Sequence, residues 1–184
     1  MRSAATVNPA MLCLAALMTC GGIGAATAQQ PAPATHEIPQ SVRLEHEDTL
    51  QQLAVLARRP GPVGVEARKA LELFKRHIKR EEEYILPPLA LLPRLADGKA
   101  TPDMKWAIAM ADRVKSDREE IFQEHTQITD TMNALANAAQ RAHDTEALDF
   151  AHTAVADSLN DIELMEPMAV VVGDYLKMKL PAGQ

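Results

Sequence analysis

The chain has few of the residues and patterns that are typical of disulfide-bonded, sheet-rich or nucleic-acid-binding proteins. Its 184 residues include only two cysteines, Cys13 and Cys20, and aromatic residues make up 3%. No stretch alternates apolar and polar residues over strand length, which argues against a sheet. Acidic residues outnumber basic ones, the formal net charge is −6, and the two signs are mixed along the chain. This balance gives no indication of nucleic-acid binding.

The first 28 residues have the layout of a secretory signal peptide. Arg2 precedes an apolar run over residues 10–26, and Ala26-Thr27-Ala28 matches the small-residue cleavage pattern. Cleavage after Ala28 predicts a periplasmic or secreted protein; lipidation of Cys20 is the alternative. Because both cysteines leave with the signal, any metal site must use nitrogen and oxygen ligands. We expect no transmembrane span in the mature chain.

After a Pro/Ala-rich stretch at residues 29–38, expected to be a disordered linker, residues 39–180 are expected to form one helical domain. The first helix is expected at 39–59, and the second runs from 65 to the prolines at 87–88, with a short continuation to 95. The third is expected from a start signal at Thr101-Pro102-Asp103 to 142, and the fourth from Asp144 or Thr145 to Pro167. A short C-terminal helix follows Pro167. Helices joined by short turns can bury their apolar stripes only against one another, so the predicted fold is all-α, an antiparallel four-helix bundle.

One apolar stripe carries two polar residues. His77 and Glu81 lie four residues apart, on the same helical face as Phe74, Ile78 and Ile85. Burying an ionised carboxylate without a partner costs several kcal/mol or forces it to become neutral. A metal cation is the simplest partner for Glu81.

An internal repeat adds further candidate ligands. The stretch LEHEDTLQQLAVLA at residues 44–57 resembles QEHTQITDTMNALA at residues 123–136. His46 and His125 lie on the apolar stripes of these two segments. Each half of the domain therefore contributes one histidine from its first helix, pointing toward the middle of the bundle.

The second helices of the two halves align through Pro87 and Pro167. Ten residues before these prolines stand His77 and Asp157, and six residues before them stand Glu81 and Asp161. Inward-facing residues from four helices would then converge, which is how helical bundles build carboxylate sites for two metal ions. The predicted metal ligands are His46, His77, Glu81, His125, Asp161 and Asp157.

Residues 40–180 resemble the hemerythrin-like (HHE cation-binding) family, of the exported bacterial type. The resemblance rests on Glu-His at 45–46, H-x-x-x-E-E-E-x-x-L-P at 77–87 and E-H-x-x-I at 124–128. It implies a four-helix bundle around a non-haem di-iron centre. It further implies that His46 and His77 bind one iron, that His125 binds the other, and that Glu81 bridges them.

The fourth helix departs from the family pattern. Where the family has H-x-x-x-E, this chain has Asp157 and Asp161. Aspartate binds iron through oxygen, so these residues remain candidates, but the second iron position is expected to be altered and to bind more weakly.

Acidic residues next to the candidate ligands have two interpretations. Glu45 and Glu124 point about 100° away from their neighbouring histidines; they either accept hydrogen bonds from imidazoles on other helices or face solvent. Glu82 and Glu83 are expected to face water.

These features predict a non-enzymatic iron protein that binds or senses dioxygen, nitric oxide or iron itself. No nucleophile–histidine arrangement or phosphate-binding loop is present. The alternatives are a di-iron oxidase or peroxide-decomposing enzyme, and a metal-free bundle that serves as a structural or interaction module. No protein partner is indicated.

Overall fold

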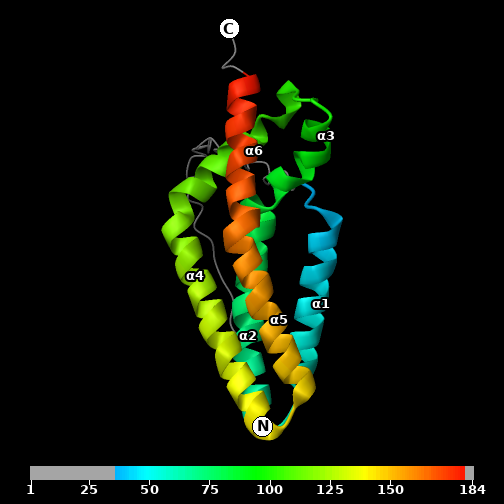
Figure 1. Ribbon diagram of the computed structural model, residues 1–184, viewed down its shortest axis with the longest axis vertical. Coiled ribbons are helices and arrows are strands. Elements are labelled where there is room, and N and C mark those ends of the chain that lie inside the picture. The colour runs from blue at the N-terminus through cyan, green and yellow to red at the C-terminus, as the bar shows by residue number, and fades with distance from the viewer. Residues whose placement is uncertain (1–35, 181–184) are drawn as a thin grey trace, which may run out of the picture. The chain divides into compact units, whose positions relative to one another are not determined.

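The computed structural model describes residues 36–180, which are helical with no β-strand (Figure 1). The all-α prediction is confirmed. The predicted signal peptide and most of the predicted linker lie outside the described residues. The elements are α1 (Gln40–Leu56), α2 (Gly61–Arg80), the π-helical turn η1 (Glu81–Ile85), the 3₁₀ turn η2 (Pro87–Leu91), α3 (Leu92–Ala96), the 3₁₀ turn η3 (Pro102–Met104), α4 (Trp106–Ala142), α5 (Thr145–Asn160), the π-helical turn η4 (Asp161–Met165) and α6 (Glu166–Lys179).

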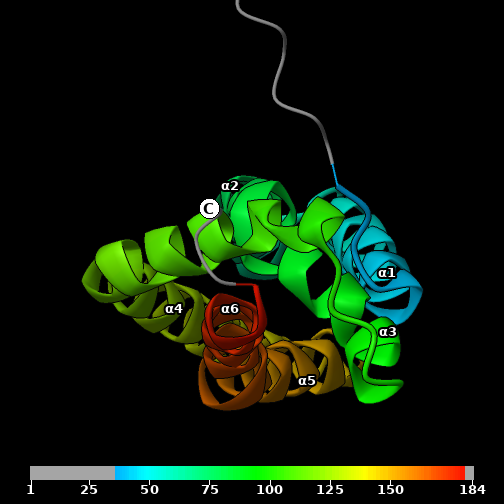
Figure 2. The same cartoon turned by 90° about the horizontal axis from the view of Figure 1, so that it is seen from above.

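The long helices pack lengthwise against one another. Helix α4 has 37 residues and contacts α2, α5 and α6, while α1 contacts α2 and α5. Figure 2, seen from above, shows α2 between α1 and α4, with α5 and α6 on the opposite side. These contacts are compatible with the expected four-helix bundle. Among residues 36–180, no helix has the length and apolar character needed to cross a membrane.

The helix boundaries differ from the predicted ones where local interactions override the pattern. Helix α1 ends at Leu56 and α2 begins at Gly61, four residues before the expected start, because Pro62 occupies the first turn. The Asp144 carboxylate caps α5 by accepting a hydrogen bond from the Ala147 N–H at 3.1 Å. At the expected start signal, the Thr101 hydroxyl does not cap a helix, because it accepts a hydrogen bond from Arg94 instead.

Two π-helical turns begin at Glu81 and Asp161, the residues that the repeat pairs. The Leu86 N–H donates to the Glu81 carbonyl at 2.8 Å, and the Glu166 N–H donates to the Asp161 carbonyl. Both turns precede a proline that lacks an N–H. The wider π-helical turn accommodates Pro167, so α5 continues through η4 into α6 instead of ending at the proline.

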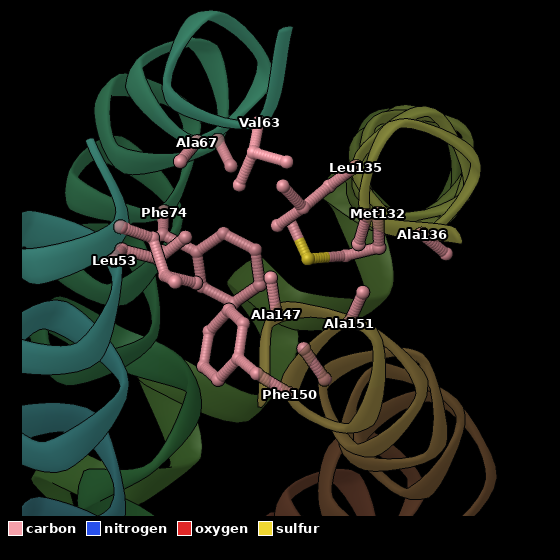
Figure 3. Packing of buried hydrophobic residues seen from close by; sticks show 14 of the residues in the cluster. Leu53, Val63, Ala67, Phe74, Met132, Leu135, Ala136, Ala147, Phe150 and Ala151 are labelled. Carbon is pink, nitrogen blue, oxygen red and sulfur yellow. The ribbon is translucent and has the colours of Figure 1, made fainter. Parts of the chain in front are cut away.

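Apolar side chains fill the interior on both sides of a polar layer. Figure 3 shows Phe74, Met132 and Phe150 pointing toward one another from α2, α4 and α5. A second cluster joins Ile38, Val42, Leu86, Leu89 and Ala169. Ile38, the last residue but one before α1, lies in the stretch expected to be a linker, yet it is buried in this cluster. On α1, His46 lies between Val42 of the second cluster and Leu53 of the first.

Helices α4 and α6 approach closely at Gly173. A Cβ at this position would lie 2.2 Å from the Cβ of Ala111. The absence of a side chain therefore allows the two helices to approach closely at this point.

Candidate metal centre

The centre is built around Glu81, at the end of α2. Only 1% of this residue is exposed, and His77, one turn earlier, is 4% exposed. The Glu81 Oε2 atom lies 3.4 Å from His77 Nε2 and 3.2 Å from His46 Nε2 on α1. Two imidazoles from different helices thus share one carboxylate oxygen.

His125 reaches the same region from α4. It is fully buried, and its ring lies edge-on to that of His77 with centroids 4.7 Å apart. His77, Glu81 and His125 each offer a ligand atom within 4.8 Å of the others, so these three can hold a metal ion. The structure therefore brings together the four residues that carry the sequence argument, since His46 adjoins Glu81 directly.

Glu166, at the start of α6, is a member of the centre that the sequence analysis missed. It is 8% exposed, and its Oε1 lies 2.9 Å from His125 Nε2. Five residues separate it from Asp161, which on a regular α-helix would turn it about 140° away. The π-helical turn between them changes this relation. The proline alignment offered no signal either, because it pairs Glu166 with Leu86.

Each imidazole also has an oxygen neighbour on its outer nitrogen. His125 Nδ1 lies 2.9 Å from the Ser158 hydroxyl, and His77 Nδ1 lies 3.6 Å from Glu124 Oε1. For His46, Nδ1 lies 3.1 Å from Glu82 Oε1. Metal-binding histidines have this arrangement, in which the outer partner fixes the ring and leaves the inner nitrogen free to bind.

Two of these outer partners bear on the sequence analysis. Glu82 is exposed, as expected, and in addition its carboxylate contacts His46. Glu124, for which two interpretations were open, contacts His77 and also pairs with Arg80 at 3.2 Å. Nothing in the sequence context of Ser158 marks it as a partner of a histidine.

Asp157 and Asp161 border a cavity of about 20 Å³ next to Glu81 and His77. Both are partly buried. Burial, together with the negative charge of Glu81, raises the pKa of Asp161 to about 8. Burial also raises the pKa of Asp157. Neither belongs to the compact group of ligand atoms from His77, Glu81 and His125.

The imidazoles and Glu81 shift one another's pKa. Burial alone would raise the pKa of Glu81, but His77 and His46 outweigh it, so the pKa lies below its usual value. Burial disfavours charge on His46 and His77, yet Glu81 and the outer carboxylates raise the pKa of both imidazoles. A bound cation would compete with protons for the imidazole nitrogens.

Within residues 36–180, three buried polar atoms of the centre have no hydrogen-bond partner. They are Glu81 Oε1, His125 Nε2 and Glu166 Oε1. The last two are 2.9 Å apart but do not have hydrogen-bond geometry. Buried polar atoms without partners are rare in native proteins, so this group calls for a ligand.

The separations of the donor atoms fit a metal ion. With metal–ligand bonds of about 2.1 Å, two donors on one ion lie about 3.0 Å apart at a right angle and about 3.4 Å apart in a tetrahedron. The observed separations of 2.9, 3.2 and 3.4 Å fall in this range. The donors are imidazole nitrogens and carboxylate oxygens, a set that suits iron and other first-row transition metals.

Comparison with known proteins adds no family assignment. No protein-family model matches the chain, and no curated protein or solved structure gives a significant match.

Proposed function

We propose that this chain is an exported iron protein of the hemerythrin-like type, an antiparallel four-helix bundle holding two iron ions. In this proposal His46, His77 and Glu81 bind one ion, while His125 and Glu166 bind the other. Glu81, whose second oxygen has no partner, is shared between the two ions. The observation that carries the proposal is the close approach of three inner imidazole nitrogens to two buried carboxylates.

Glu166 changes the expectation for the second ion. From the sequence, the second iron position is expected to be altered and to bind more weakly, because Asp157 and Asp161 stand where the family has H-x-x-x-E. Glu166 lies 2.9 Å from His125. These two buried side chains can therefore bind the second ion without either aspartate.

The size of the cavity favours a small ligand. A volume of about 20 Å³ is enough for about one water molecule, and a diatomic molecule needs little more. Bound iron would supply a centre to which dioxygen or nitric oxide can bind. The side chains hold the ions, orient the imidazoles through Ser158, Glu124 and Glu82, and exclude bulk water. We therefore infer binding or sensing of a small molecule.

Iron oxidation is a second candidate function. Glu81 and Glu166 are buried carboxylates, and Asp161 borders the cavity; hard oxygen donors favour ferric over ferrous iron. Repeated oxidation of added ferrous iron by catalytic amounts of protein would support this activity. A single stoichiometric reaction would support binding.

Iron analysis combined with visible absorption spectroscopy tests the proposal. Protein purified from the periplasm is expected to contain about two irons per chain and to change its spectrum when the reduced form is exposed to dioxygen or nitric oxide. His77→Gln should lose iron, whereas His152→Gln, a control at an exposed histidine of α5, should retain it. Wild-type protein that takes up no iron under reducing conditions would refute the proposal and favour a metal-free module.

A further inference from the structure

A surface groove between α1 and α5 is lined by acidic side chains. Its volume is about 540 Å³, and no lysine or arginine lines it within residues 36–180. Its carboxylates are Glu45, Asp48, Glu146, Asp149 and Asp157.

Most of this negative charge is not neutralised. At the outer end Glu146 pairs with Arg59, and Asp48 accepts a hydrogen bond from Gln52. In the described part of the chain, Glu45, Asp149 and Asp157 form no ion pair. A cleft lined by charge of one sign raises the local concentration of the opposite ion, and it can accelerate association by about 10- to 1,000-fold.

The groove meets the cavity of the candidate metal centre. Glu45, Thr49, Ala154 and Asp157 line both spaces. On the inner side the cavity is bordered by Glu81, which is 1% exposed and has an unpartnered Oε1 atom. Carboxylates thus extend from the surface to a buried oxygen that lacks a partner.

We propose that this groove is the uptake route for a divalent metal cation, with Glu45 and Asp157 at its neck and Asp161 leading inward to Glu81. The inference rests on the proposed function, since it assumes that the centre binds metal. It assigns Asp157 a role in uptake rather than as a ligand. At a cavity of about 20 Å³ a hydrated cation must shed most of its water, and the neck carboxylates replace those oxygen ligands as it passes.

Rapid-mixing measurements with Co²⁺ on the metal-free protein test the route, with the visible absorption of bound cobalt as the signal. Compared with wild type, E45Q/D157N should take up cobalt about 10-fold more slowly, with the same stoichiometry and a dissociation constant that changes far less. The control D97N/D130N removes two exposed carboxylates outside the groove and should leave the rate nearly unchanged. Raising the ionic strength should slow wild type more than E45Q/D157N.

Three outcomes would overturn the uptake route. One is an unchanged rate in E45Q/D157N, and another is an equal loss of rate in the control. The third is a lower cobalt stoichiometry in E45Q/D157N, which would make Asp157 or Glu45 a ligand. If wild type binds neither cobalt nor ferrous iron, the proposed function fails as well, whereas the three outcomes above leave it standing, so the two failures are distinguishable.

Discussion

Replacing both His77 and Glu81 by leucine separates the cost of burying the polar cluster from the gain of binding metal. The two side chains are 4% and 1% exposed, and leucine has a similar volume to each. In the metal-free protein Glu81 Oε1 has no partner, and such a buried atom costs about 1–3 kcal/mol. Replacing buried ion pairs by apolar residues is often neutral or stabilising by about 1–4 kcal/mol.

We therefore expect metal-free H77L/E81L to be more stable than metal-free wild type by about 1–3 kcal/mol, or about 3–10 °C in melting temperature for a domain of this size. Metal at 100 times its dissociation constant should stabilise wild type by about 2.7 kcal/mol and the variant not at all. Thermal melts followed by circular dichroism, with and without ferrous iron under anaerobic conditions, measure both effects.

A control variant, H152Q/E163Q, changes an exposed histidine and an exposed glutamate and should behave like wild type. The reasoning would be refuted by a metal-dependent stabilisation that survives in H77L/E81L. It would also be refuted by a metal-free variant less stable than wild type, because the cluster would then stabilise the fold without a cation.

Three further changes test other parts of the structure. Ser158→Ala should weaken metal affinity about 10-fold at unchanged stoichiometry, by removing the outer partner of the α4 imidazole, and metal titration measures this. Asp144→Ala should cost about 1–2 kcal/mol at pH 7 in urea unfolding, through loss of the α5 cap. Arg59 lowers the pKa of Asp144. The stabilisation by the Asp144 charge is therefore fully present above about pH 4 and is lost as the pH falls through the lowered pKa. In strong acid, the unfolding stability of Asp144→Asn should become equal to that of wild type. Gly173→Ala should lower unfolding stability by about 1–3 kcal/mol through a clash with Ala111, and Ala111→Gly should restore much of it.

The outer contacts of the centre show where sequence reasoning stops. Helical periodicity places Glu82 and Glu124 about 100° from the inward-facing residues, which is compatible with solvent or with a neighbouring helix. Only the packing of α1 on α2, and of α2 on α4, decides that they reach His46 and His77. Ser158 is an ordinary small residue of α5 until α4 places His125 Nδ1 2.9 Å from its hydroxyl.

Residue order alone determined that the domain is helical and that His46, His77, Glu81 and His125 lie on inward faces, because apolar periodicity defines which face of a helix is buried. Glu166 could not be found in this way, since a π-helical turn breaks the 100° rotation on which the pattern depends. The tertiary structure also decided that an acidic groove meets the centre between α1 and α5. That meeting depends on how two helices distant in sequence pack, which no local pattern encodes.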